Sequence, residues 1–387
     1  MPEAVIVATG RSPIGRAYKG SLITTRPDDL LGYVVKKVLE KVPELPHDEV
    51  DDLICGCGFP QGETGMNVGR LAVFLSGLPD TVPGTTVNRF CASSLQAIRM
   101  GYHAIKSGEG KAFVCAGVES VSRVKTMPDA EDINMRLFGD DAIAQAYITM
   151  GMTAENVADK YGITREEMDE YAYQSQMKAA KARESGFWDN EVITVATPEG
   201  NEVSQDDGIR ADTTLEKLAT LQPAFKEGGK VTAGNACPLN DGAAAVIVMD
   251  EDYAKSLGIK PLARIKASAV SGIDPAIMGV GPIEACKRVL DRAGMKIEDI
   301  DVVELNEAFA AQVIPVAREV GLRPREAEPA RRCDRPRPPL RHDRRTHHVD
   351  AAQRPADDGQ DLRAGDHVRR RRPGHGHGRR AAQLNAR

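Results

Sequence analysis

Short apolar segments alternate with amphipathic segments of helical period from residue 4 to about residue 320. Apolar runs of this length, bounded by Gly, Asp or Asn, predict buried strands. Five such runs are AVIVATG, DDLICGCG, GKAFVCAG, AAAVIVM and DVVELNEA. Strands that alternate with helices form sheets whose faces are covered by helices. The sequence therefore predicts an α/β fold, and its 387 residues, 41% of them hydrophobic, suffice for a large core.

Two pairs of segments share a rhythm that indicates two halves of similar topology. DEVDDLICGCG resembles IEDIDVVELNEA, and EAVIVATGRSPIG resembles LARIKASAVSGID. Between about 121 and 230 the composition becomes polar and helical, and this stretch carries the single tryptophan, Trp188. We interpret it as an insertion that stands on the sheet core.

The cysteines argue against a disulfide framework, because their number is odd and they are scattered over a long chain. Cys55 and Cys57 end a predicted strand without a histidine nearby, so we assign them to the packed core rather than to a metal site. Cys115 and Cys286 are also assigned to the core. No catalytic metal is expected.

Cys91 lies in the segment TTVNRFCASSLQAI, between a predicted strand and a helix that should run from about Ala92 to Ser107 and end at Gly108. A thiol at a helix N-terminus faces unpaired N–H groups and the positive end of the helix dipole. Both favour the thiolate, which is the nucleophile. The alternative is that Cys91 is a small buried hydrophobe.

The chain carries a net charge of −5, which gives no reason to expect nucleic acid or an anionic membrane as a partner. No apolar run is long enough to span a bilayer. The N-terminus begins directly with a strand pattern and without a basic leader, so a cytoplasmic location is expected.

The composition changes from Leu322 to Arg387. This tail has 18 arginines, 9 acidic residues and six of the eight histidines, but no Lys, Ile, Met, Phe, Tyr or Trp. A basic arm that binds a polyanion is one interpretation, weakened because no aromatic residues lie between the arginines to stack on bases. Its His-rich pieces, RTHH and PGHGHG, lack the spacing of an ordered metal site.

Residues 1 to about 321 resemble the thiolase family of acyl-CoA acyltransferases. Four segments carry the resemblance, in the family's order: NRFCASSLQA, CAGVESVSR, TAGNACPLNDGAAAVIV, and GPIEA followed by DIDVVELNEAFAAQ. The last two favour thiolases over the related ketoacyl synthases. The resemblance implies a five-layer αβαβα core of two similar halves with an inserted loop domain. We accordingly expect an N-terminal half at 1–120, completed by about 231–258, a loop domain at 121–230, and a truncated C-terminal half at 259–321.

The resemblance also implies roles for individual residues. Cys91 would carry the acyl group, and its backbone N–H would line an oxyanion hole. Asn306 would hold a water that stabilises an enolate or thioester oxyanion. Cys237, which stands where the family often has Ser, and Phe309 are expected on the substrate side. CoA and acyl-CoA would be substrates, without a further cofactor, and the chain would form a homodimer or homotetramer.

The C-terminal region departs from the family. Thiolases use a histidine from a Gly-His-Pro motif and a second cysteine from a Cys-x-Gly motif, and the tail contains neither; its one cysteine is Cys333. With a suitable choice of codons, a one-base shift near Arg323–Pro324 restores both motifs. We therefore interpret 322–387 as a frameshifted tail. The alternative function is a catalytically impaired thiolase-like chain that at most binds CoA esters and lacks the last strands and helices of its C-terminal half.

Overall fold

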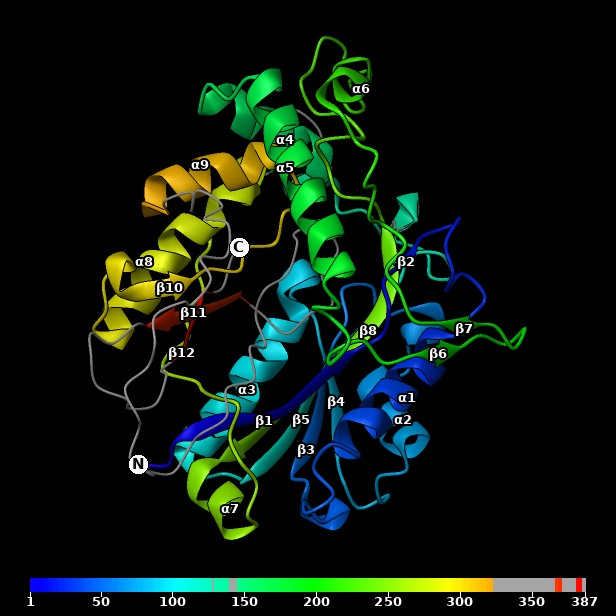
Figure 1. Cartoon of the computed structure of the whole chain (residues 1–387), viewed down its shortest axis with the longest axis vertical. Helices are drawn as coiled ribbons and strands as arrows, with labels where there is room; N and C mark the ends of the chain where they lie inside the picture. The colour runs from blue at the N-terminus through cyan, green and yellow to red at the C-terminus, as the bar shows by residue number, and fades with distance from the viewer. Residues whose placement is uncertain (127–128, 139–144, 323–365, 371–380, 385–387) are drawn as a thin grey trace, which may run out of the picture.

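The computed structural model describes residues 1–126, 129–138, 145–322, 366–370 and 381–384 (Figure 1). Its helices are α1 Pro27–Leu39, α2 Val68–Ser76, α3 Ser93–Ser107, α4 Met150–Lys160, α5 Arg165–Glu184, α6 Leu215–Ala219, α7 Glu251–Ser256, α8 Gly281–Ala293 and α9 Ala310–Val320. Its strands are β1 Ala4–Arg11, β2 Gly15–Arg16, β3 Asp52–Gly56, β4 Gly84–Val87, β5 Ala112–Ser120, β6 Val195–Ala196, β7 Glu202–Val203, β8 Asn240–Asp250, β9 Ala263–Arg264, β10 Ile300–Val302, β11 Asp366–Arg370 and β12 Ala381–Leu384.

The large sheet has the strand order β4-β3-β5-β8-β1-β9, with β2 paired to β8. Strands β4, β3 and β5 are parallel to one another, whereas β8 is antiparallel to both β5 and β1. The strands predicted around AVIVATG, DLICG, AFVCAG and AAAVIVM are therefore neighbours in one sheet.

Helices cover both faces of this sheet. Successive side chains of a strand point to opposite faces, and these strands carry apolar side chains on both, so both faces must be covered. In β1, Val5 and Val7 belong to the core under α1 and α2, while Ala4 and Ile6 belong to the core under α3. The predicted α/β fold class is confirmed by this arrangement.

The second half of the chain repeats part of the element order of the first. A 3-10 turn, His47–Glu49, precedes β3, and a second one, Ile297–Asp299, precedes β10. Helix α8 precedes this second turn and α9 follows β10, just as α1 precedes the first turn and α2 follows β3. The similarity between DEVDDLICGCG and IEDIDVVELNEA thus has a structural counterpart.

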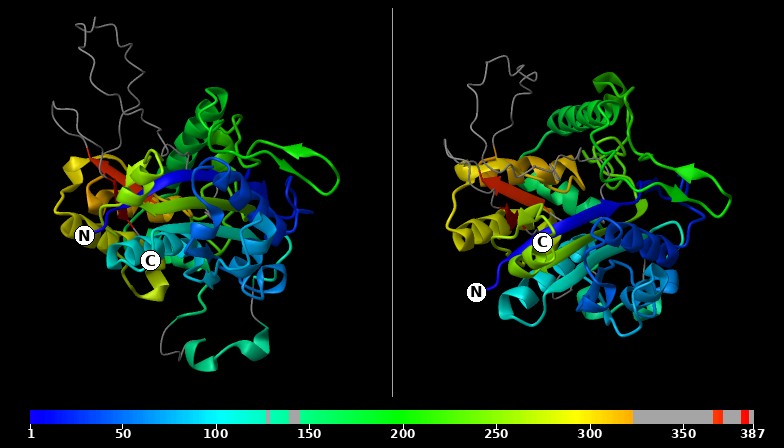
Figure 2. Two further views of the ribbon diagram at one scale, coloured as in Figure 1. Left: turned by 90° about the horizontal axis from the view of Figure 1, so that it is seen from below. Right: turned by 60° about the horizontal axis from the view of Figure 1, so that its bottom comes forward.

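Residues 121–230 contain α4, α5, α6 and the hairpin β6–β7, which extends away from the sheet layers (Figure 2). Helices α4 and α5 pack on α9 through one apolar cluster that includes Ile163, Met168, Ala310 and Ala311 (Figure 1). This contact ties the predicted insertion to the loop that precedes α9.

Two short segments of the tail form strands beside the second half. Strand β11 pairs antiparallel with β10, and β12 pairs with β11. Strand pairing joins backbone groups, so it does not require the large apolar side chains that this tail lacks. Cys333, RTHH, PGHGHG and the shift position near Arg323–Pro324 lie outside the described residues.

Within the part of the chain that the structure describes, no helix is both long and apolar enough to cross a membrane.

Candidate active site

Cys91 lies at the edge of the sheet where the parallel strands end. Strand β4 ends at Val87, the 3-10 turn Phe90–Ala92 follows, and α3 begins at Ser93. The predicted helix end at Ser107 and the terminator Gly108 are confirmed, whereas Ala92 caps the helix instead of belonging to it. In open α/β sheets, ligands bind at this carboxyl edge of the strands.

The turn before Cys91 is held in an unusual backbone conformation. Phe90 has a φ of 45°, a region that a bulky residue rarely adopts. Its N–H donates to Asn88 Oδ1 at 2.7 Å, while Ser93 Oγ donates to the Phe90 carbonyl at 2.6 Å and accepts from the Arg89 N–H at 2.8 Å. Such strain persists where surrounding contacts over-determine it, and it is typical of functional sites.

Cys91 is exposed, whereas Cys55, Cys57, Cys115 and Cys286 are buried, as expected. Burial raises the pKa of the Cys57 thiol to about 12 and also raises the pKa of the Cys115 thiol, so both remain protonated near neutral pH. The alternative that Cys91 is a small buried hydrophobe is therefore wrong. It is the exposed thiol among the described cysteines, and it stands at the N-terminal end of α3.

Helix α3 reaches its position because two strands carry a glycine where the helix begins: Gly56 ends β3, and Gly117 lies within β5. A methyl group on Gly56 would overlap the backbone of Ser93 and Ser94, and one on Gly117 would overlap the Ser94 side chain. The absence of a Cβ at both positions lets the start of the helix lie directly on β3 and β5.

We expect Gly56→Ala to lower the free energy of unfolding by about 1–3 kcal/mol, because the helix N-terminus must move to make room. Gly272→Ala is the matched control, since a Cβ there meets open space, and it should change stability by less than about 0.5 kcal/mol. Urea unfolding measures both, and equal effects would show that the close packing at Gly56 is unimportant.

Asn306 lies in the segment between β10 and α9. This segment is joined to the one before β8, since the Cys237 N–H donates to the Ala308 carbonyl at 2.9 Å and the Ala310 N–H to the Asn235 carbonyl at 3.0 Å. The first residues of β8 pair with the end of β5.

This register brings the four candidate residues, Cys91, Cys237, Asn306 and Phe309, to one edge of the large sheet. Cys237, Asn306 and Phe309 are partly buried. The Phe309 ring meets that of Phe225 edge-on, with 6.1 Å between the ring centroids. At least part of the Phe309 side chain therefore packs in the cluster beneath α9.

Glu307 is a residue of this site that the sequence analysis did not single out. Its carboxylate accepts hydrogen bonds from the Tyr171 hydroxyl and, at 2.7 Å, from the Ser175 hydroxyl, both on α5. The available signal was its place next to Asn306 in the Asn-Glu-Ala-Phe motif. Glu307 links the Asn306 segment to the inserted helices.

Burial raises the pKa of Glu307 from 4.5 to about 8, although both hydroxyls favour the ionised form. A carboxyl whose pKa is higher in the folded than in the unfolded chain stabilises the fold while it is protonated. Its contribution is complete below about pH 4.5 and is lost as the pH rises towards and through 8. We expect Glu307→Gln to flatten the fall in unfolding free energy over this interval, measured by urea unfolding at several pH values. Glu298→Gln, at an exposed position, should leave the slope unchanged; an unchanged slope in Glu307→Gln would contradict the assignment.

Among the described residues, no group of three or more His, Cys, Asp or Glu side chains is placed to hold a metal ion. The geometry offers instead an exposed thiol on a strained turn, with a helix N-terminus and the loop that carries Asn306 at the same sheet edge.

Comparison with known proteins agrees with this geometry. The model of the thiolase N-terminal domain matches residues 4–252, and that of the thiolase C-terminal domain matches residues 259–329. The chain belongs to the thiolase family. It is an acyltransferase by family and shares the thiolase fold.

Individual thiolases match most of the chain. A 3-ketoacyl-CoA thiolase of Bacillus subtilis (strain 168) is 44% identical over 334 residues, which cover 83% of this chain and 85% of that protein. A 3-oxoadipyl-CoA/3-oxo-5,6-dehydrosuberyl-CoA thiolase of Escherichia coli (strain K12) is 43% identical over 340 residues, covering 83% and 84%. The crystal structure of the Bacillus anthracis acetyl-CoA acetyltransferase superposes with a TM-score of 0.75 at 40% identity and covers 84% of each chain.

Proposed function

We propose that this chain makes or cleaves 3-oxoacyl-CoA through an acyl thioester on Cys91. The observation that carries the proposal is the exposed Cys91 thiol on a strained turn at the start of α3. The other cysteine near this edge, Cys237, is partly buried, and the four core thiols are inaccessible.

In the cleaving direction, the Cys91 thiolate attacks the 3-oxo carbon of the substrate. The bond between C2 and C3 breaks, the acyl group stays on Cys91, and the released acetyl-CoA enolate takes up a proton. The thiolate of free CoA then attacks the acyl thioester and regenerates the Cys91 thiolate. Splitting the transfer into two exchanges at sulfur is what a cysteine nucleophile makes possible.

Asn306 and the backbone N–H of Cys91 are the proposed sources of oxyanion stabilisation, as the family resemblance implies. Donors aimed at developing negative charge usually contribute the largest single share of acyl-transfer catalysis. Cys237 and Phe309 remain candidates for contact with the substrate, and CoA and acyl-CoA enter as substrates rather than as resident cofactors.

A specific observation favours a second candidate function, a catalytically impaired thiolase-like chain that at most binds CoA esters. The tail contains neither the Gly-His-Pro nor the Cys-x-Gly motif that would supply a general base. Loss of a general base typically costs about 10²–10⁴-fold in rate.

Thiolysis of acetoacetyl-CoA by free CoA separates the two functions. An active thiolase gives many turnovers per chain, whereas an impaired chain consumes at most one equivalent of substrate. Resequencing the gene across the codons for residues 320–338 tests the proposed frameshift: a corrected base there restores both motifs, and an unchanged sequence refutes the frameshift.

We also propose that the chain forms a homo-oligomer. Among the described strands, β4 forms one of the two edges of the large sheet, and a strand edge offers backbone groups to another chain. Exposed Phe74 and Phe90 lie on the helix and turn next to β4. Sedimentation velocity should give at least a dimer mass, and a monomer at micromolar concentration would contradict the proposal.

A further inference from the structure

Glu119 is a buried carboxylate at the end of β5 that the proposed reaction does not use. It is 6% exposed and accepts hydrogen bonds from the backbone N–H groups of Gly58, at 2.7 Å, and Phe59, at 3.2 Å. We propose that Glu119 is a positioning residue that fixes the turn carrying Cys91 by holding the Gly58–Phe59 backbone against it. This inference rests on the proposed function of Cys91.

Gly58 connects Glu119 to the turn. Its carbonyl accepts a hydrogen bond from Asn88 Nδ2 at 2.8 Å, and Asn88 Oδ1 accepts from the Phe90 N–H at 2.7 Å. A Cβ on Gly58 would lie 3.5 Å from the Phe90 Cα, so the two backbones are nearly in contact. The rings of Phe59 and Phe90 also meet edge-on, with 6.2 Å between their centroids. A continuous series of contacts thus leads from Glu119 to the residue immediately before the nucleophile.

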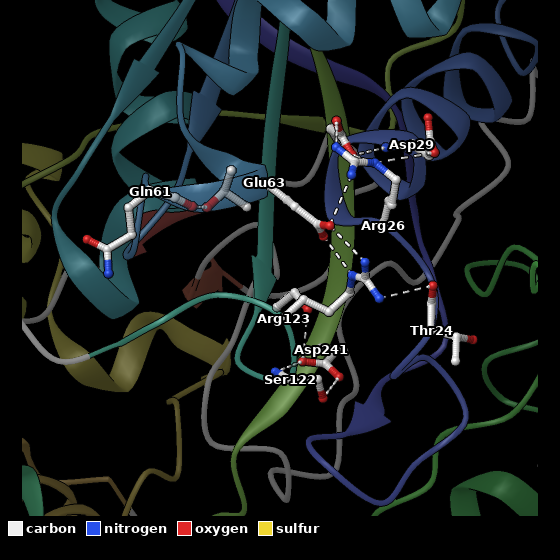
Figure 3. Close-up of polar contacts among 11 residues, drawn as sticks. Thr24, Arg26, Asp29, Gln61, Glu63, Ser122, Arg123 and Asp241 are labelled. Carbon is white, nitrogen blue, oxygen red and sulfur yellow. Dashed lines mark hydrogen bonds and ion pairs between the residues drawn. The ribbon is translucent and has the colours of Figure 1, made fainter.

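The segment that begins at Gly58 and Phe59 continues to Glu63, and this second end is fixed by contacts at the surface (Figure 3). The Glu63 carboxylate accepts two hydrogen bonds from Arg123, at 2.6 and 2.7 Å, and one from Arg26 at 3.0 Å. Gln61 donates to the Lys125 carbonyl. Exposed ion pairs contribute little to rigidity because water and salt compete for them. The buried Glu119 is therefore the stronger constraint on the end of the segment that faces Cys91.

The environment of Glu119 makes this constraint sensitive to protonation. Burial raises its pKa from 4.5 to about 7, while the two N–H donors favour the ionised form. The titratable groups that face it are the Cys57 thiol, 3.7 Å away on the chain leaving β3, and the Asp241 carboxylate on β8. The ionised carboxylate accepts from both N–H groups, whereas a proton on one oxygen removes an acceptor site.

Glu119→Gln tests the inference, because an amide presents a donor where one of the two N–H groups needs an acceptor. Acetylation of Cys91 by acetyl-CoA is measured as a single turnover, and alkylation of Cys91 by iodoacetamide is measured in parallel, both by peptide mass mapping. The ratio of the two rates cancels the thiolate fraction and reports how well the thiol is positioned. In the unaltered chain this ratio should fall as the pH drops through about 7. In Glu119→Gln it should be about tenfold lower at pH 8 and independent of pH.

Two further variants make the test specific. Asn88→Ala breaks the next contact of the series and should lower the ratio in the same way, without removing the carboxylate. Glu63→Gln breaks the surface ion pairs of the same segment and should behave like the unaltered chain. A Glu119→Gln chain with the original ratio and pH profile would overturn the inference, as would an equal loss in Glu63→Gln.

Amide hydrogen exchange of the peptide covering residues 86–95 distinguishes a failure of the positioning inference from a failure of the proposed function. Glu119→Gln should speed exchange there about tenfold, whether or not acetyl-CoA reacts. Unaltered chain that resists acetylation, together with faster exchange in the variant, refutes the proposed function and supports the role of Glu119. Acetylation of the unaltered chain without any change in exchange refutes the role of Glu119 alone.

Discussion

Cys91→Ala is expected to abolish thiolysis, lowering the turnover rate by roughly 10⁴-fold or more, as removal of a covalent nucleophile does in other acyl-transfer enzymes. The physical reason is that no other described thiol is both exposed and placed at the start of α3. Release of CoA from acetyl-CoA should disappear together with thiolysis, because both begin with attack by the same sulfur. A spectrophotometric assay of acetoacetyl-CoA cleavage, run at high enzyme concentration, measures the loss.

Cys237→Ser is the matched control for this change. Cys237 lies at the same sheet edge but is partly buried, and the family often has serine at this position. We expect less than about a tenfold change, since serine is close to cysteine in size and the proposed mechanism forms no covalent bond to this side chain. If Cys237→Ser were as damaging as Cys91→Ala, or if Cys91→Ala kept its activity, Cys91 would not be the nucleophile.

Asn306→Ala carries the second largest expected effect, a loss of about 10²–10³-fold in turnover, the range for removal of one oxyanion donor. The loss should fall on the chemical step, because Asn306 lies in the loop before α9 rather than in the turn that carries Cys91. Alkylation of Cys91 by iodoacetamide should therefore keep its original rate. Single-turnover acetylation compared with alkylation measures the difference.

Asn190→Ala, at an exposed position beyond α5, provides the control for removing an amide side chain. It should leave both rates unchanged. Equal acetylation in Asn306→Ala and the unaltered chain would remove Asn306 from the oxyanion site, and a parallel loss of alkylation would assign it to the folding of the turn instead.

The parts of the fold that depend on local periodicity could be predicted from the sequence. The end of α3 at Ser107 follows from the spacing of its apolar residues and from Gly108, which adopts a φ of 79°. The strands around Val5, Ile54, Val114 and Ile247 follow from apolar runs, because burial on both faces leaves no room for polar positions. The position of Cys91 just before α3 was predictable because its motif lies between a strand pattern and a helix pattern.

The supporting carboxylates were not predictable, because their roles depend on groups far away in the chain. The hydrogen bonds of Glu119 exist only because β3 pairs with β5 and so brings Gly58 and Phe59 to the end of β5. The hydrogen bonds of Glu307 likewise exist only because α5 places two hydroxyl groups against its carboxylate. An isolated glutamate in a sequence gives no sign of burial, which is a property of the packed layers.

The pairing of β11 with β10 shows the same limit at the level of secondary structure. Composition alone gave no strand in the tail, since β-branched and aromatic residues are scarce there. An open strand edge at β10 supplies backbone partners that no local pattern records. The proposed domain boundaries, the oligomer and the cytoplasmic location stay predictions.

The most direct measurement is peptide mass mapping of the unaltered chain after brief incubation with acetyl-CoA and acid quenching. A single acetyl group on the peptide that contains Cys91, removed again by added CoA, is the result that the account predicts. It would be obtained even from a chain that turns over slowly, because only the first half of the reaction is required. An unmodified Cys91, or acetyl found instead on another cysteine, would contradict the acyl-thioester mechanism on which the account depends.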